Sequence, residues 1–176
     1  MYKILISLVF SLFILNLSEA FESKKPEEAL KQIYPLSTVE VKNFVIPKEV
    51  VEKLEREQGL KLNSRMVTFY IVKKEGKQIA YGYVDIHTVR TKPEAVLYTI
   101  TPDGKLDMVQ VLAFHEPLEY LPEERWFKQF SKKDENSIKF KRDIQNLTGA
   151  TLTSRAITEN AKKALLLWKT LLGEEI

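Results

Sequence analysis

The stretch VTFYIVKKEGKQIAYGYV, residues 67–84, decides the fold because it predicts the first pairing of a sheet. Two runs rich in β-branched and aromatic residues, 66–73 and 79–89, flank the dipeptide Glu75-Gly76. Runs of this composition are typical of strands, and a glycine in a short polar connection is typical of a tight turn. We therefore expect an antiparallel hairpin.

Further strands extend the hairpin on both sides. Alternating or β-rich patterns predict strands over 38–46, 95–101 and 106–114, with turn residues at Pro102-Asp103-Gly104 between the last two. A short strand is also expected over 137–140.

Helices are predicted before, between and after these strands, where apolar residues recur at helical spacing: 25–34, 47–58, 122–132 and 153–172. The expected fold is α+β, a single domain with a mostly antiparallel sheet packed with helices. Its long C-terminal helix follows a turn rich in glycine and hydroxyl residues.

The N-terminus carries a targeting signal. A short positive start precedes an apolar run over 4–17, and Ser18-Glu19-Ala20 has small residues where a signal peptidase cleaves. We expect a signal peptide over 1–20, an N-terminal helix and strand over 21–44, and the main domain over 45–176. An uncleaved membrane anchor is the alternative, although the run is shorter than the ~20 residues that a spanning helix needs. Either way, the protein is expected to be exported, in the periplasm or on the outer face of the cytoplasmic membrane.

Composition excludes several classes of protein. The 176 residues include 27 basic and 24 acidic side chains, a net charge of +3, and the charges are mixed rather than gathered into a nucleic-acid-binding face. The absence of cysteine excludes disulfides, Cys-attached haem and thiolate iron–sulfur sites. With only two histidines, in separate segments, no metal site is expected.

The segment NLTGATLTSRAITENAKKAL, residues 146–165, allows two interpretations. The first is ordinary helix capping, since Thr and Ser accept backbone N–H bonds at an N-cap and Gly149 permits unusual dihedrals. The second is a phosphate site, because the first turn of a helix exposes unpaired N–H groups and partial positive charge. Gly149 and Ala150 are small enough to let an anion approach the backbone.

The motif differs from two common ones and resembles a third. No Gly-Lys-Ser/Thr follows, as in a Walker loop, and the second glycine of a Gly-x-Ser-x-Gly elbow is missing. TGATLTSRAIT, residues 148–158, resembles the flavin-attachment signature Asp-x-x-Ser/Thr-Gly-Ala-Thr of the FMN-binding domain family. That family includes flavin-carrying subunits of sodium-pumping NADH:quinone oxidoreductase and of the related Rnf complex, and small exported flavoproteins, which this chain resembles most. The family's order of elements covers roughly residues 45–172, which makes 45–176 the expected FMN-binding domain.

The resemblance implies a cofactor, an attachment point and partners. In the family, a separate flavin transferase joins FMN through a phosphoester bond to the Thr after Gly-Ala, which is Thr151 here. The redox partner would be another protein or a membrane electron-transfer complex. The other implied cofactor-binding residues are neighbours of the acceptor and one distant carboxylate: Thr148, Gly149, Ala150, Leu152, Thr153 and Glu116.

The sequence departs from the family pattern at two places. Gln145 stands where the family has Asp, six residues before the acceptor, and the nearest Asp is Asp143. After Glu116 the run Pro117-Leu118-Glu119 lacks the glycine that often follows nearby in the family.

A flavin ring needs an apolar slot and a few hydrogen-bonding groups, while the cofactor itself carries the redox chemistry. His87 and His115 are candidates to contact the ring. Candidates for the slot, each of which also fits ordinary core or surface, are Tyr81, Tyr83, Phe114 and Leu152.

Three functions remain open at this point. The first is an exported FMN-binding electron carrier, since no general base, nucleophile pair or metal cluster accompanies the motif. The second is an exported binding or scaffold module that has kept the fold and lost the flavin, which Gln145 favours. The third is an enzyme that reduces a small substrate with bound FMN.

Overall fold

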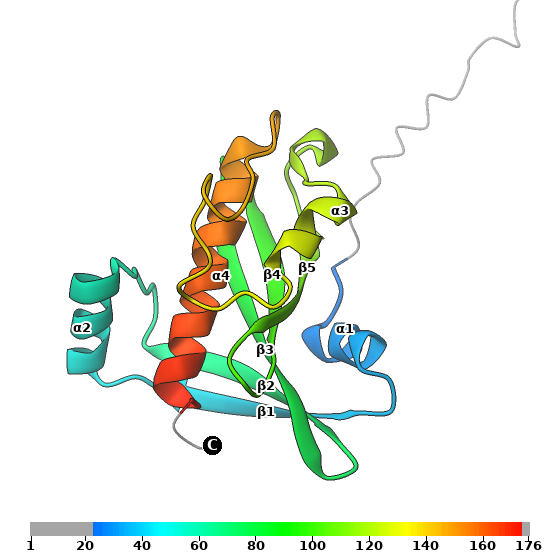
Figure 1. Cartoon of the computed structure of the whole chain (residues 1–176), viewed down its shortest axis with the longest axis vertical. Helices are drawn as coiled ribbons and strands as arrows, with labels where there is room; N and C mark the ends of the chain where they lie inside the picture. The colour runs from blue at the N-terminus through cyan, green and yellow to red at the C-terminus, as the bar shows by residue number, and fades with distance from the viewer. Residues whose placement is uncertain (1–22, 174–176) are drawn as a thin grey trace, which may run out of the picture.

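The computed structural model describes residues 23–173, and one antiparallel sheet organises them (Figure 1). Five strands follow one another as a meander in the order β1-β2-β3-β4-β5. They are β1 Thr38–Val45, β2 Met66–Lys74, β3 Lys77–Thr88, β4 Pro93–Ile100 and β5 Leu106–Phe114. The predicted α+β class and the hairpin are confirmed, while the predicted signal peptide lies outside the described residues.

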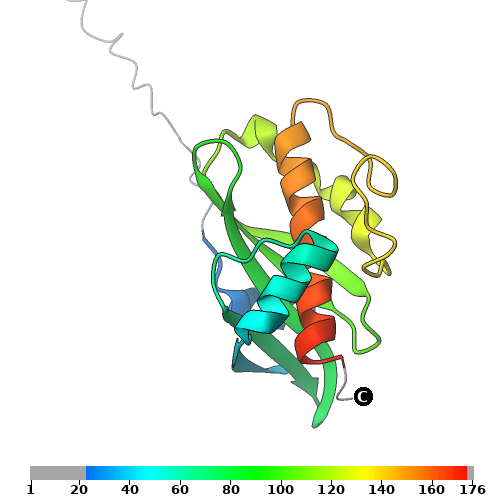
Figure 2. The ribbon, with the colours of Figure 1, turned by 90° about the vertical axis from the view of Figure 1, so that its left-hand side faces the viewer.

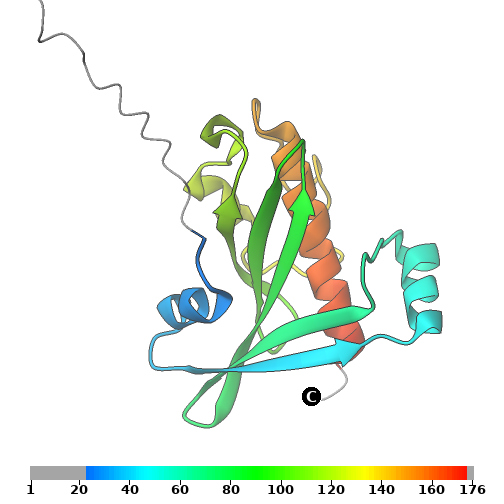
Figure 3. The same cartoon turned by 180° about the vertical axis from the view of Figure 1, so that it is seen from behind.

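Helices cover both faces of the sheet. They are α1 Pro26–Ile33, α2 Lys48–Gln58, α3 Glu124–Phe127 and α4 Thr151–Leu171, with short 3-10 turns η1 Leu118–Tyr120 and η2 Lys128–Phe130. In side view, α1 lies on one face while α2 and α4 lie on the other (Figure 2). Seen from behind, the sheet lies in front of α4 (Figure 3). Among residues 23–173, none of the helices has the length and apolarity of a bilayer-spanning segment.

The main core lies between α4 and the sheet. Along α4, Ile157, Ala161, Ala164, Leu165 and Trp168 recur at helical spacing and are buried, as the sequence pattern predicted. The helix begins at Thr151, two residues before its predicted start.

The predicted helix over 122–132 is replaced by two shorter pieces, α3 and η2. The reason lies in the residues that follow Phe130. Lys132 donates its N–H to the carbonyl of Leu106, and Leu106 donates to Lys133, so the backbone there is bonded to the start of β5 instead of continuing a helix. Trp126 and Phe130 are buried in edge-to-face contact, 5.2 Å between ring centroids.

The predicted strand over 137–140 was wrong. Only one isolated bridge, Phe140 to Ile144, is found there. The carboxylate of Asp134 accepts hydrogen bonds from the N–H groups of Asn136 and Ser137, at 3.0 and 2.9 Å. Local bonds of this kind offer the backbone an alternative to a sheet ladder.

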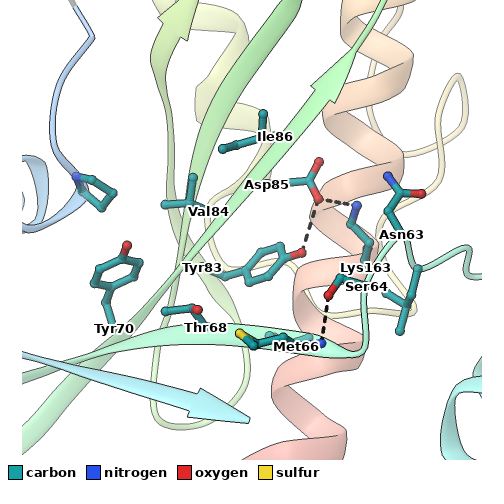
Figure 4. Close-up of a pocket in the computed structure, with 13 residues that line it drawn as sticks. Asn63, Ser64, Met66, Thr68, Tyr70, Tyr83, Val84, Asp85, Ile86 and Lys163 are labelled. Atoms are coloured by element: carbon teal, nitrogen blue, oxygen red, sulfur yellow. Dashed lines mark hydrogen bonds and ion pairs between the residues drawn. The ribbon is translucent and has the colours of Figure 1, made fainter. Parts of the chain in front are cut away.

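The ladder between β2 and β3 ends partway along both strands. Its last pair toward the start of β2 is Phe69–Tyr83. Beyond it, residues 66–68 pair only with β1, and 84–88 pair only with β4. The two strands diverge there and leave an opening beside α4 (Figure 4).

The turn between β4 and β5 fixes the far end of α4 and yields a stability prediction. Gly104 has a φ of +79°, and a Cβ there would lie 2.5 Å from the Trp168 ring. Gly76 has a similar φ of +75° with open space around it. Gly76→Ala should therefore cost only the left-handed penalty, about 1 to 2 kcal/mol. Gly104→Ala should cost about 1 to 3 kcal/mol more from overpacking.

Urea denaturation of the two variants checks this. The unfolding midpoint should fall clearly further for Gly104→Ala than for Gly76→Ala. Equal losses would mean that the close approach of Trp168 contributes nothing to stability.

Candidate functional site

The turn before α4 has an unusual backbone. Gly149 has a φ of +90°, which residues with side chains rarely adopt. The N-cap residue is Ala150, and no side chain caps the helix. The structure therefore does not contain the hydroxyl cap that one interpretation of this segment predicted.

The uncapped end leaves amides available. No hydrogen bond joins the N–H of Thr151, Leu152 or Thr153 to another residue within 23–173. The first amide with an intrahelical bond is that of Ser154, which donates to Ala150 at 2.9 Å. Because α4 has 21 residues, its first turn carries the partial positive charge of a full helix.

The hydroxyls of this segment divide into accessible and buried groups. Thr148 is exposed, and Thr151 is partly exposed and donates from Oγ1 to the carbonyl of Leu147 at 3.3 Å. Ser154 is buried and donates to the carbonyl of Ala150 at 2.5 Å. Thr153 is buried, and its Oγ1 has no partner among the described residues. Only Thr148 and Thr151 can present a hydroxyl to a molecule arriving from outside.

Glu116 holds a neighbouring loop. Its carboxylate accepts hydrogen bonds from the N–H groups of Thr91 at 2.7 Å and Lys92 at 2.8 Å. These backbone bonds lower the pKa of Glu116. The loop that follows β5 and the segment before α4 lie at the same end of the molecule (Figures 1 and 2). Glu116 therefore holds the loop over 89–92, which lies at the same end of the domain as the turn, by binding the N–H groups of Thr91 and Lys92.

The segment just upstream of the turn is pinned through its backbone. The indole N–H of Trp126 donates to the carbonyl of Gln145 at 2.8 Å, and the N–H of Gln145 donates to Gln129 at 2.9 Å. The Gln145 side chain is exposed. Asp143, the nearest Asp along the sequence, is bound by Arg142 at 2.8 Å.

Most of the slot candidates belong to the core. Tyr81 is buried against Trp168, with ring centroids 5.7 Å apart, near the opposite end of α4 from the turn. Tyr83 is buried against Phe69. Leu152 is 42% exposed beside the turn, and His115 is exposed. Phe114 is buried and pairs with Glu94, at the end of the sheet that lies near the turn before α4.

Sequence reasoning missed a buried polar cluster under α4, which we call the β3–α4 charge chain: Lys163, Asp85, His87 and Glu94. Lys163 contacts one carboxylate oxygen of Asp85, and the other lies 2.8 Å from Nδ1 of His87. Nε2 of His87 lies 2.6 Å from Glu94. The sequence contained one sign of this cluster: Asp85 and His87 are two residues apart, which places both side chains on one face of β3. The neighbouring sequence did not indicate that this face is buried.

The charge chain sets the protonation of its members. Burial alone would lower the pKa of His87, but Asp85 and Glu94 outweigh it and raise that pKa from 6.5 to about 9. Burial would raise the pKa of Asp85, yet His87 and Lys163 hold it below its usual value. His87 is therefore cationic at neutral pH. Its favourable contribution to folding is fully present below about pH 6.5 and is lost as the pH rises through about 9.

The role of Glu116 can be tested with one substitution. Glu116→Gln removes the charge from the bonds to Thr91 and Lys92, so both amides should exchange with solvent about tenfold faster. Hydrogen exchange followed by NMR measures these rates. Glu119→Gln, an exposed neighbour, is the control and should leave both rates unchanged. Unchanged exchange in Glu116→Gln would show that the carboxylate does not hold the loop.

Comparisons with known proteins bear on the family that this chain resembles. Residues 92–166 match the sequence model of the family described as FMN-binding domain, a region that contains Glu94, Glu116 and Thr151. The chain is also similar to one of the subunits of the Na⁺-translocating ferredoxin:NAD⁺ oxidoreductase complex of Acetobacterium woodii. The identity is 26% over 144 residues, which cover 72% of this chain and 67% of that protein. The resemblance of this chain to the FMN-binding domain family is thereby confirmed, and FMN is the cofactor that this domain implies.

Proposed function

We propose that this protein is an exported FMN-binding electron carrier, with the flavin attached through its phosphate to Thr151. The observation that carries the proposal is the position of that hydroxyl. Thr151 is partly exposed at an uncapped helix N-terminus, directly after a left-handed glycine and one alanine. It lies inside the region that matches the FMN-binding domain.

The residues of the turn fit a phosphate group. The unpaired N–H groups of the first turn of α4, together with the partial positive charge of a helix N-terminus, favour the binding of an anion. A Cβ added at Gly149 would meet no atom within 4 Å, so the approach to the backbone is open. Thr153 contributes its free amide, since its hydroxyl is buried. Thr148, Ala150 and Leu152 complete the binding segment.

Glu116 contributes at a distance from the phosphate. By accepting hydrogen bonds from Thr91 and Lys92, its carboxylate holds a loop at the end of the domain where the flavin would lie. When bound, FMN supplies electron acceptance and donation. The protein holds and orients it.

The partners follow from the same proposal. A flavin transferase would form the phosphoester bond, and a redox protein or a membrane electron-transfer complex would exchange electrons with the flavin. The similarity to one component of an oxidoreductase complex that translocates Na⁺ supports the second kind of partner. The apolar N-terminal run supports export. We infer a carrier rather than a stand-alone enzyme.

A second candidate function is a scaffold module of the same fold without covalent flavin. Gln145 favours it, since an amide stands where the family has a carboxylate. If the flavin transferase requires that carboxylate, the chain would keep the binding turn and escape modification.

Removal of the acceptor hydroxyl tests attachment. Wild-type protein produced with a flavin transferase in an exporting host should remain fluorescent after denaturing electrophoresis, with a mass increased by FMN less water. Thr151→Ala should lose both signals completely. Thr170→Ala, an exposed threonine at the other end of α4, should keep them. A wild-type protein without the added mass would rule out covalent attachment.

The departure at Gln145 gives a prediction in the opposite direction. Gln145→Asp restores the family pattern at an exposed side chain whose backbone contacts stay in place. The fraction of protein carrying FMN, measured by intact mass, should rise or stay complete. A fall would mean that the flavin transferase acts on this chain through other residues.

A further inference from the structure

Charge is distributed unevenly between two parts of the described chain. Residues 124–173 contain 11 Lys and Arg side chains and five Asp and Glu side chains, a net charge of +6, whereas residues 23–123 contain 15 of each and are neutral. The loop over 135–142 lies beside α4 (Figures 1 and 2). Much of the excess positive charge is therefore found around one helix, although the whole sequence mixes the two signs.

A pocket of about 430 Å³ lies between this loop and α4. Lys139 and Arg142 line it from the loop, and Lys162 lines it from the helix. The guanidinium of Arg155 lies 5.6 Å from the ring centroid of Phe140, which also belongs to the pocket wall. We call the basic side chains of this loop and of the neighbouring side of the helix the α4 basic face: Lys139, Lys141, Arg142, Arg155 and Lys162.

Most cations of the α4 basic face are not neutralised by an ion pair. Arg142 pairs with Asp143 at 2.8 Å, but no ion pair joins the other four members to an acidic residue within 23–173. The pocket wall contains two acidic residues. Glu135 is already bound by Lys169 at 2.5 Å, so Glu159 is the one that offsets the cations. The face therefore presents positive charge to solvent.

The loop holds its basic residues in fixed positions. The carbonyl of Lys139 accepts hydrogen bonds from the N–H groups of Arg142 and Asp143, at 3.2 and 2.8 Å, and Lys141 donates to the carbonyl of Ile144 at 2.9 Å. Lys141 has a φ of +66°, in the left-handed region that favours glycine. A lysine at a strained backbone position is a reason to seek a function for its side chain. A loop that is already fixed also loses less freedom when a partner binds.

The α4 basic face shares one side of the helix with the proposed attachment residue. Thr151, Arg155 and Lys162 are spaced by four and seven residues, which places their side chains on one stripe of a helix. At a rise of about 1.5 Å per residue, Thr151 and Lys162 lie about 16 Å apart along α4. A typical protein interface buries about 800 Å² on each partner, which is wide enough to include both ends of that stripe.

We propose that the redox partner docks through an acidic surface on the α4 basic face and is thereby seated beside the turn that carries Thr151. This docking rests on the proposed function, which supplies the need for a redox partner. Opposite charges across an interface raise the association rate and fix the orientation of the partner. A carboxylate that protrudes from the partner would enter the pocket between Lys139 and Lys162.

The shape and charge of the face favour a protein over an anionic membrane. A bilayer is broad and meets side chains that protrude, whereas these cations surround a hollow. Glu159 in the pocket wall would repel lipid phosphates, but a protein can place a basic residue of its own against it. A protein surface can therefore match both signs of charge on this face.

A peptide of about ten glutamates is the acidic probe that tests the docking. It is titrated into ¹⁵N-labelled protein, and binding is followed by NMR. Peak shifts should be confined to residues 135–142 and 151–162. The dissociation constant should rise about tenfold between about 50 and about 200 mM salt, because salt screens exposed charges.

Two double variants separate this face from general attraction between opposite charges. Lys139→Glu with Lys162→Glu should weaken peptide binding about tenfold or more. Lys74→Glu with Lys77→Glu makes the same change in net charge at two exposed lysines that pair across the β2–β3 hairpin, and it should weaken binding less than about threefold. If the first double variant does not fold, Lys141→Glu, at an exposed residue of the same loop, replaces it and should weaken binding about threefold or more.

Peak shifts spread over the whole surface, or equal weakening by the two double variants, would overturn the proposal. Vesicles of phosphatidylglycerol provide the membrane arm. If they bind wild type at about 150 mM salt and lose it in the Lys139→Glu, Lys162→Glu variant, the face serves a membrane and the proposal is overturned. The titration needs no flavin, so its failure would leave attachment at Thr151 in place. A wild type without FMN would overturn the proposed function and this docking with it.

Discussion

The structure depends on the burial of α4 across one face of the meander. Ile157, Leu165 and Leu167 are at most 1% exposed, and burial of each such side chain stabilises the fold by about 1.5 to 3 kcal/mol. At its C-terminal end, Trp168 lies against Gly104 in the turn between β4 and β5. This contact and the buried face keep α4 from sliding along its own axis, so the position of its first turn relative to the sheet is set. The free amides before Ser154 are held rigidly without any cap.

An uncapped helix N-terminus lowers stability locally, even inside a well-packed domain. Replacing a good N-cap by Ala costs about 0.5 to 2 kcal/mol, and this chain has Ala150 at that position although Thr148 and Thr151 are close by. The hydroxyl of Thr151 is instead turned to the carbonyl of Leu147. An anion at the turn would provide the hydrogen-bond acceptors that a capping side chain normally provides. The backbone of Gly149 makes room for one, so the local cost and the proposed phosphate site have the same origin.

The sequence predicted what depends on neighbours along the chain. The hairpin, the turn at Gly104 and the burial of Ile157 follow from period, turn chemistry and helical spacing. It failed where distant residues decide. Pairing of Lys132 with Leu106 ends the helical region at Phe130. The charge chain was hidden for the same reason: Asp85 and His87 on a strand suggest a solvated face until Lys163 covers them. The turn at Asp134 is an exception, because its bonds to Asn136 and Ser137 are local and the pattern there was misread as a strand.

The β3–α4 charge chain also helps to hold α4 on the sheet. Removal of one partner from a buried ion pair commonly costs about 3 to 5 kcal/mol, because the other charge is left uncompensated. Lys163 and Asn160 come from α4, whereas Asp85, His87 and Glu94 come from the sheet, so every contact between the two groups also fixes the helix on the sheet. Since the proposed attachment turn is the first turn of that helix, these contacts help to hold the turn in its place beside the sheet.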